Sequence, residues 1–176
     1  MTALRTGPWL RFRDRRRGDS RPTAPVTVVL ASTGQAISAD AIERAAALSA
    51  GAPAAVVTIA RIHGSAFGLP NPGLLPSRRE REEQRTIVST AIEQLGRHDV
   101  EADGQIIVTR NAGKAISRVA VSRGASYVVL QAPPHGALRL LLEGDPARVL
   151  RRRLRPGATL VLVKPGVIEP SRHDPA

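Results

Sequence analysis

The stretch from Ser126 to Asp145, SYVVLQAPPHGALRLLLEGD, decides the fold because it leads from a strand through a loop to the start of a helix. Residues 127 to 130 form an apolar run of strand length, and Gly144 precedes a residue pair, Asp145 and Pro146, that is typical of a helix start. A helix N-terminus offers unpaired backbone N–H groups and a partial positive charge. We therefore predict an α/β protein with a candidate anion site at this junction.

The capping position of that predicted helix carries an acidic residue. The Asp145 carboxylate can cap the helix itself, and Pro146 suits the first helical position. The protein then occupies its own anion site and repels a polyphosphate. We expect capping to be the role of Asp145.

Strand and helix patterns alternate on both sides of this stretch. The sequence predicts strands at 26–31, 54–62, 103–110, 126–131 and 158–164, and helices from Ser38 or Asp40 to about Ala50 and at 77–96, 112–123 and 145–154. Such alternation implies right-handed crossovers and one parallel sheet. Aromatic residues make up only 2% of the chain, so the core consists of Val, Ile, Leu and Ala between helices on both faces.

The second predicted helix has two different parts. Its start, RREREEQR at 78–85, is predicted to be a solvated face with charges of both signs. The side chains predicted to face the core follow it: Ile87, Val88, Ala91, Ile92 and Leu95.

Residues 25 to 165 resemble the universal stress protein family. VTVVLASTGQ at 26–35 is similar to the family's first strand and turn, RNAGKAISRVAVSRGASYVVL at 110–130 to its Gly-x-Pro helix and following strand, and ATLVLVKP at 158–165 to its closing strand. The resemblance implies a single doubly wound five-stranded parallel sheet, Rossmann-like, with helices on both faces and strand order 3-2-1-4-5. It further implies a cytoplasmic regulatory or stress-response domain that forms a homodimer through strand 158–164.

The family's ATP-binding element has three glycines followed by Ser or Thr, and this chain keeps only the third glycine. The four positions fall on Gln131, Pro134, Gly144 and Asp145, and the acidic residue that usually ends the first strand is replaced near Thr33. The resemblance therefore implies a degenerate nucleotide pocket with weak or no ATP binding. No cofactor is expected, and ATP or another adenine nucleotide is the disfavoured alternative.

The candidate pocket lies where sequence order reverses between the first and fourth strands, since ligands of open α/β sheets bind at that point. Its residues come from the two loops that meet there: Ala31, Ser32, Thr33, Gly34, Leu130, Gln131, Pro134, Gly144 and Asp145. Each has a structural alternative. Gly34 can meet a phosphate or simply make a turn. Gln131 can contact a nucleotide edge or fill the space that glycine would leave.

Three further features near this loop bear on anion binding, and two of them allow two interpretations. Pro134 lacks an amide donor, which weakens any phosphate cradle. His135 is either a base or phosphate partner or an exposed loop residue. Four arginines can gather around an anion or remain solvated: Arg139, Arg148, Arg151 and Arg152.

Catalytic motifs are absent from the sequence. It contains no Gly-x-Ser-x-Gly elbow, no Walker loop, no His-Glu-x-x-His pair and no acidic metal cluster. With no cysteine, disulfides and thiolate metal sites are excluded. We expect no catalytic residue, no metal ligand and no enzymatic activity.

The chain is strongly basic, with a formal net charge of +11, and only Lys114 and Lys164 among its 26 basic residues are lysines. Residues 1–24 hold seven Arg against two Asp, together with Trp9, Leu10 and Phe12. Either a genome composition that favours Arg codons or an anionic partner explains this charge. The alternative function is therefore an adaptor whose Arg-rich tail binds nucleic acid, an anionic membrane surface or an acidic protein.

The predicted domain organisation follows from these patterns. Residues 1–24 form a disordered basic tail, 25–165 the α/β domain and 166–176 a flexible C-terminal tail. We expect neither a signal peptide nor a transmembrane segment, because no apolar run has the required length.

Overall fold

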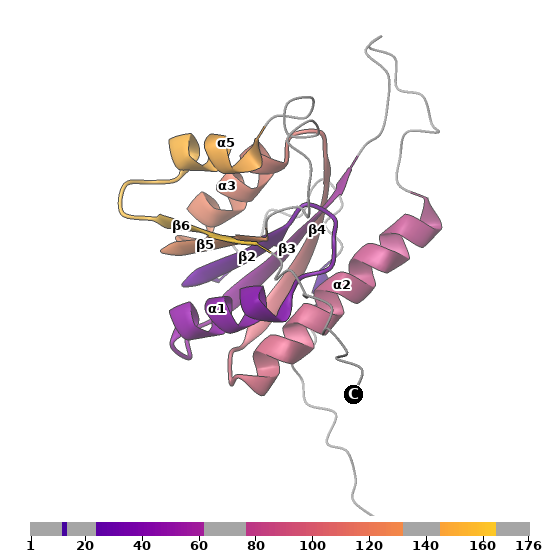
Figure 1. Cartoon of the computed structure of the whole chain (residues 1–176), viewed down its shortest axis with the longest axis horizontal. Helices are drawn as coiled ribbons and strands as arrows, with labels where there is room; N and C mark the ends of the chain where they lie inside the picture. The colour runs from indigo at the N-terminus through magenta and orange to yellow at the C-terminus, as the bar shows by residue number, and fades with distance from the viewer. Residues whose placement is uncertain (1–11, 14–23, 62–76, 132–144, 165–176) are drawn as a thin grey trace, which may run out of the picture.

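The computed structural model describes residues 12–13, 24–61, 77–131 and 145–164 (Figure 1). In chain order the elements are β1 (Phe12–Arg13), β2 (Val28–Ser32), α1 (Ala39–Ser49), β3 (Ala54–Arg61), α2 (Arg78–Arg97), β4 (Ala102–Thr109), α3 (Ala112–Ser122), β5 (Tyr127–Gln131), α5 (Pro146–Arg153) and β6 (Thr159–Val163).

All the strands are parallel, in the order β1-β4-β3-β2-β5-β6. The five predicted strands are present, and their order confirms the predicted 3-2-1-4-5. The sequence did not predict β1, which extends the sheet beyond β4 by pairing Phe12 with Gly104 and Arg13 with Gln105. A strand of two residues is too short to produce a hydrophobic pattern.

Helices cover both faces of the sheet, with α1 and α2 on one side and α3 and α5 on the other (Figure 1). Successive residues of β2 face the two layers in turn. Val28 and Leu30 pack in the core under α1 and α2, while Val29 and Ala31 pack under α3 and α5. Because both faces are covered, central strands are continuously apolar, as the sequence predicted.

Two glycines allow close packing of helices in this core. A Cβ atom on Gly104 would lie 2.1 Å from Val88 Cγ1, so only glycine lets α2 lie this close to β4. A Cβ atom on Gly113 would lie 2.7 Å from Val149 Cβ, so α3 and α5 also approach closely. Substitution at either glycine would push a helix outward.

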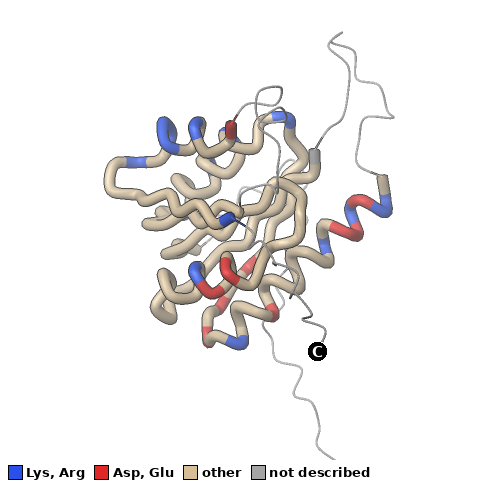
Figure 2. Tube along the Cα trace, in the orientation of Figure 1, with Lys and Arg blue, Asp and Glu red and all other residues tan. Residues whose placement is uncertain are grey.

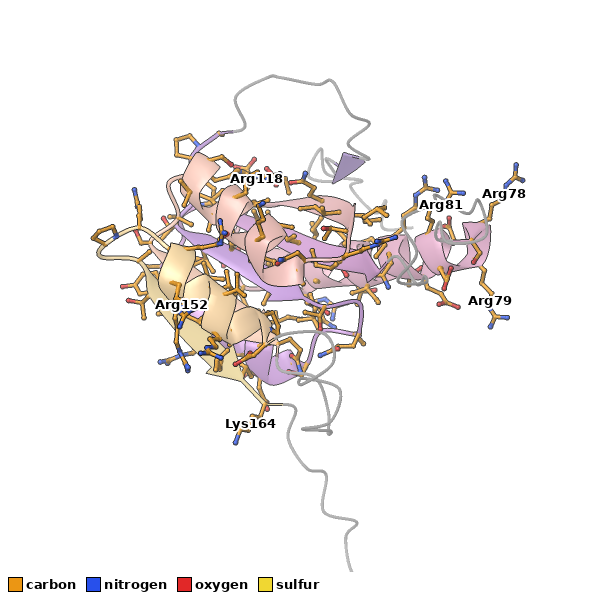
Figure 3. All side chains as sticks on the ribbon, turned by 90° about the horizontal axis from the view of Figure 1, so that it is seen from above. Arg78, Arg79, Arg81, Arg118, Arg152 and Lys164 are labelled. Carbon is orange, nitrogen blue, oxygen red and sulfur yellow. The ribbon has the colours of Figure 1, made fainter. Side chains whose placement is uncertain are left out.

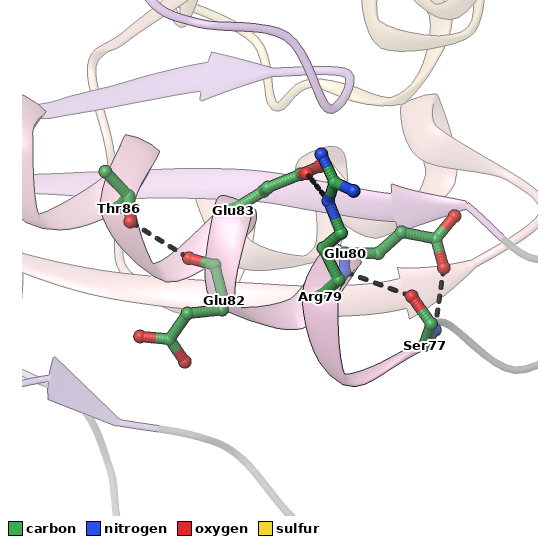
Figure 4. A network of polar contacts seen from close by, with 6 residues as sticks. All are labelled: Ser77, Arg79, Glu80, Glu82, Glu83 and Thr86. Carbon is green, nitrogen blue, oxygen red and sulfur yellow. Dashed lines mark hydrogen bonds and ion pairs between the residues drawn. The ribbon is translucent and has the colours of Figure 1, made fainter.

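The helix starts follow from local capping chemistry. Ser77 and Glu80 form a capping box on α2: the Glu80 N–H donates to Ser77 Oγ at 3.1 Å, and the Ser77 N–H donates to Glu80 Oε2 at 2.6 Å (Figure 4). The exposed first turns of α2 also contain an ion pair between Arg79 and Glu83.

One prediction about α2 is wrong. The solvated face predicted for residues 78–85 includes Gln84, whose side chain is buried. Gln84 precedes Val88 by four residues and therefore shares the side of the helix that packs on the sheet. Ile87, predicted to be in the core, is only half-buried.

Predictions about the two chain termini are mostly outside the described residues. Within residues 1–24 the structure describes only Phe12, Arg13 and Ala24, and it describes nothing from 165 to 176. A disordered basic tail and a flexible C-terminal tail therefore remain predictions.

Candidate functional site

The carboxyl ends of β2 and β5 lie side by side at the centre of the sheet. Ala31 pairs with Leu130 in the register, so Ser32 and Gln131 end adjacent strands. The described helices that come next in the chain, α1 after β2 and α5 after β5, lie on opposite faces of the sheet (Figure 1). The predicted reversal of strand order therefore lies here, at the usual ligand-binding position of this architecture.

A buried glutamine from α2 holds the loop between β2 and α1. Gln84 Nε2 donates to the Gly34 carbonyl at 2.9 Å, and Gln84 Oε1 accepts a hydrogen bond from the Thr58 hydroxyl on β3. Gly34 has a φ of 101°, and a Cβ atom there would lie 2.9 Å from the Ile59 carbonyl oxygen. The structure thus supports the turn interpretation of Gly34: its conformation and tight packing both require glycine.

A second buried glutamine holds the start of α1. Gln131 Oε1 accepts from the Ser38 hydroxyl at 2.8 Å and from the Ser38 backbone N–H at 3.1 Å. The Ser38 hydroxyl in turn accepts from the Ala41 N–H as the N-cap of α1. Gln131 is 2% exposed, so this side chain occupies interior space and contacts α1.

The remaining candidates on β2 and its loop also bind within the protein. Ser32 is buried and its hydroxyl donates to the Gln35 carbonyl, while the Thr33 hydroxyl lies 3.3 Å from Gln35 Oε1. Ala31 and Leu130 are apolar core residues beneath α3 and α5. The hydroxyl groups of Ser32, Thr33 and Ser38 are therefore all bound within this junction.

Asp145 is the N-cap of α5, as predicted. Its carboxylate accepts from the Ala147 N–H at 2.9 Å, and Pro146 occupies the start of the helix. One backbone donor that an anion would use is therefore bound to a side chain of the protein itself. Of the other loop candidates, Pro134, His135, Arg139 and Gly144 lie outside the described residues, as does Pro133.

Sequence reasoning missed the partners of both glutamines. Gln84 carries a usable signal, because it continues the buried stripe of α2 one turn before Val88. Ser38 was considered only as a helix cap. Its bond to Gln131 joins residues 93 positions apart, and no local pattern predicts such a pair.

Sequence reasoning also missed an ion pair between a buried arginine and a half-buried aspartate at the opposite, amino end of the sheet. Arg123 is 5% exposed and binds Asp103 through two bonds, Nη1 to Oδ1 at 2.6 Å and Nη2 to Oδ2 at 2.7 Å. Its Nε donates to the Ala24 carbonyl at 2.8 Å. Arg123 therefore joins the end of α3 to the start of β4 and to the segment that leads into β2.

Neither a metal site nor a membrane span occurs in the described part of the chain. There, no three His, Cys, Asp or Glu side chains are grouped as metal ligands would be. The described helices likewise include none with the length and apolar character needed to cross a membrane.

Comparison with solved structures identifies the fold. A universal stress protein in complex with cAMP matches with a TM-score of 0.57 and 17% identity, covering 82% of this chain and 100% of that one. The universal stress protein from Archaeoglobus fulgidus in complex with dAMP matches at 0.55 and 18%, over 81% of this chain and 98% of the other. A universal stress protein family member from Burkholderia pseudomallei matches at 0.54 and 19%, with the same two coverages.

At these identities the likeness establishes the fold, and the chain has the fold of universal stress proteins. Comparison of the sequence with protein-family models and with curated proteins gives no match. The resemblance noted in the sequence is thus confirmed at the level of architecture.

Proposed function

We propose that this chain is a divergent universal stress protein-like regulatory domain of the cytoplasm that binds ATP weakly or not at all. The observation that carries the proposal is the N-terminus of α5, where the Asp145 carboxylate accepts a hydrogen bond from the Ala147 N–H. This helix start is the position at which the family resemblance implies phosphate binding. Here the protein supplies its own anion.

The negative charge of Asp145 should repel a bound triphosphate. Two like charges about 4 Å apart repel by roughly 1 kcal/mol in water and by several times that near a protein surface. A helix N-terminus attracts an anion by only about 0.3 to 2 kcal/mol. The Asp145 charge is therefore sufficient to cancel the attraction that the helix would otherwise offer.

The second support is the buried position of Gln131. Its side chain fills interior space and binds Ser38, where the family resemblance implies a glycine that leaves room for a nucleotide. Gln84 holds the facing loop through Gly34. The segment between β2 and α1 is thus held at Gly34 and at Ser38, which favours a small pocket over an open triphosphate cradle.

Smaller adenine nucleotides are the ligands to test beside ATP. Two of the similar structures are complexes with cAMP and dAMP, each of which carries a single phosphate. A single phosphate suffers less repulsion from Asp145 than a triphosphate does. If the pocket accepts any nucleotide, we expect a monophosphate to bind more tightly than ATP.

Isothermal titration with ATP and with cAMP tests the degenerate site. Parent protein should bind ATP poorly, and the variant Asp145→Ser with Gln131→Gly and Pro134→Gly should bind it better. Asp145→Asn is the matched control, because it keeps a capping side chain and removes only the charge. Micromolar ATP binding by the parent would refute the proposal. No gain in a folded triple variant would show that more than the phosphate loop has changed.

We also propose a homodimer formed through β6. This strand is at the edge of the sheet, and Leu162 within it is 41% exposed. An apolar edge strand invites aggregation unless it is paired, and a symmetric pairing protects both copies at once. Light scattering should report a dimer for the parent. Val161→Pro should give a monomer or an insoluble product, and an unchanged dimer would contradict this arrangement.

A regulatory role rather than catalysis is the third part of the proposal. The full sequence lacks the nucleophile elbow, Walker loop and metalloprotease motif that would support hydrolysis. Purified protein should therefore release no phosphate from ATP above the background of an inactive control preparation. Turnover that persists through further purification would contradict this part.

A second candidate function rests on the seven arginines of residues 1–24, which support an adaptor whose tail binds an anionic partner. The salt dependence of the binding affinity distinguishes the two functions. Tail binding that neutralises several phosphates should weaken by orders of magnitude between low and moderate salt. Occupancy of a pocket inside the domain should change little.

A further inference from the structure

The folded domain has one strongly basic side. Its residues lie on α3, on α5 and in the turn after α5, and we name them together the α3–α5 surface. They are all exposed: Lys114, Arg118, Arg148, Arg151, Arg152, Arg153 and Arg155. Figure 3 shows Arg118 and Arg152 on the outer side of these two helices. Residues 112–122 and 146–155 include no Asp or Glu.

The opposite side of the sheet is electrically balanced. The helices α1 and α2 carry six acidic residues, Asp40, Glu43, Glu80, Glu82, Glu83 and Glu93, and six basic ones, Arg44, Arg78, Arg79, Arg81, Arg85 and Arg97. Figure 2 shows red and blue segments mixed along α2, but only blue along α5 after Asp145. Both sides carry similar numbers of basic residues, so a genome preference for Arg codons does not distinguish them. The asymmetry comes from the acidic residues, which residues 112–122 and 146–155 lack.

Helix stability does not explain the basic side either. Positive side chains stabilise the last turn of a helix and destabilise the first. Arg151, Arg152 and Arg153 lie in the last turn of α5, where they fit this rule. Lys114 and Arg148 lie in the first turns of α3 and α5, where they oppose the helix dipole. Their placement therefore points to a role outside the fold.

The basic groups lie along two neighbouring helices. Lys114 and Arg118 are one helical turn apart on α3, and Arg148 and Arg152 are one helical turn apart on α5. Arg155 follows in the turn after α5, where its guanidinium also donates to the Gly124 carbonyl. On α5, Arg148 and Arg152 are about 6 Å apart along the helix axis. Gly113 lets the two helices pack closely, so the basic residues of both helices belong to one layer of the domain. Duplex nucleic acid carries one charge per about 1.7 Å of its axis, so several phosphates face such a surface.

The side chains favour a phosphate backbone over other anionic partners. Six of the seven groups are guanidinium groups, whose fork matches the oxygens of a phosphate. The α3–α5 surface has no aromatic side chain on which an unpaired base could stack. Val121 is the one large apolar residue of α3 and α5 that is exposed, so little could enter a lipid layer.

We propose that the α3–α5 surface binds the phosphate backbone of double-stranded nucleic acid without sequence preference. This role is separate from the pocket at the carboxyl ends of β2 and β5. It is also separate from the Arg-rich tail, because the basic groups belong to the folded domain.

Three variants of the 176-residue chain, each with the same loss of charge, test the proposal. The surface variant carries Arg118→Gln, Arg148→Gln and Arg152→Gln. The opposite-side control carries Arg44→Gln, Arg78→Gln and Arg97→Gln. The tail control carries Arg15→Gln, Arg16→Gln and Arg17→Gln. All nine residues lie on the surface or in the tail, and circular dichroism melting verifies that the three variants fold like the parent.

The measurement is fluorescence anisotropy of a labelled DNA duplex of roughly two helical turns, about 20 base pairs, titrated at several salt concentrations. Each phosphate contact contributes about −0.9 to the slope of log K against log salt. The surface variant should lower the magnitude of this slope by about 3 and weaken binding at least about tenfold at moderate salt. The opposite-side control should bind like the parent.

Four results would overturn the proposal. In the first two, the parent fails to bind the duplex, or the surface variant binds the duplex as tightly as the parent does. In the other two, the surface variant and the opposite-side control lose equal affinity, or only the tail control loses affinity. Two parallel measurements, of vesicle binding and of self-association, test for other partners of the α3–α5 surface. Tighter binding of the parent to phosphatidylserine-containing vesicles than to duplex would make this a membrane site. Low-salt self-association that only the surface variant loses, without duplex binding, would make it a contact between copies.

Discussion

Both ends of the parallel sheet are closed by buried polar side chains, but the two ends use different chemistry. At the amino end, Arg123 and Asp103 form a charged pair that also binds the Ala24 carbonyl. At the carboxyl end, Gln84 and Gln131 make neutral hydrogen bonds to Gly34 and Ser38. In both places a side chain from one element fixes a chain segment that leads into another.

The difference has a physical reason in the cost of burying charge. A buried ion pair is costly to desolvate, and the loss of one partner strongly destabilises the fold. Such a pair therefore holds its two elements together firmly. Neutral amides cost less to bury and lose less when a partner is removed. The carboxyl end, where this architecture binds ligands, should therefore lose less stability when a buried polar residue is substituted. The amino end should lose more.

Loss of Arg123 should give the largest effect. Arg123→Met leaves the Asp103 carboxylate without its partner and frees the Ala24 carbonyl. We expect a loss of about 3 kcal/mol in the free energy of unfolding, reduced from the full cost of a broken buried pair because Asp103 is 33% exposed. Urea unfolding measures it.

The matched control is Arg118→Met on the same helix, where an exposed side chain is changed in the same way and little effect is expected. Arg123→Lys should recover only part of the stability, because one ammonium group cannot reproduce two parallel bonds. Equal losses in the free energy of unfolding for Arg123→Met and Arg118→Met would show that the charged pair does not stabilise the amino end of the sheet.

Loss of Gln84 should give the next largest effect. Gln84→Leu leaves the Thr58 hydroxyl and the Gly34 carbonyl without their partner, which costs about 1 to 3 kcal/mol. Adding Thr58→Val should cost less than the sum of the two single changes, since the unpaired hydroxyl is then removed. Gln94→Leu on the same helix is the control. Strict additivity would argue against a coupled network at the carboxyl end.

Loss of the Ser38 hydroxyl should be milder. Ser38→Ala removes the cap of α1 and one of the two bonds to Gln131, and we expect a loss of about 1 kcal/mol. Thermal unfolding of this variant, of Gln131→Leu and of the double variant forms a cycle that isolates the link between β5 and α1. A coupling energy of zero would mean that Gln131 only fills space.

The smallest effect is expected at Asp145. Asn caps a helix as well as Asp does, so Asp145→Asn should cost less than about 1 kcal/mol, mainly through the lost attraction to the helix N-terminus. Asp145→Ala should cost more, because it removes both the charge and the cap. Chemical unfolding of the two variants compares them. Equal losses for Asp145→Asn and Asp145→Ala would mean that the charge, not the cap, stabilises the start of α5.

Features that depend on near neighbours in the chain were predictable from the amino-acid sequence. The alternation of strands and helices follows from hydrophobic runs of characteristic length, and the predicted boundaries lie within a few residues of those in the structure. The caps at Ser77 and Asp145 were predictable because each bond joins residues two or three positions apart. The family resemblance supplied the strand order, which the sheet confirms.

Which polar side chains are buried depends instead on contacts between distant parts of the chain. Arg123 and the Ala24 carbonyl are 99 residues apart, Gln131 and Ser38 are 93 apart, and Gln84 and Gly34 are 50 apart. Each side chain is polar in isolation, and solvation in the unfolded chain favours its exposure. Burial becomes favourable only when packing of distant elements supplies a partner at hydrogen-bond distance, and that condition has no counterpart in any local stretch of sequence.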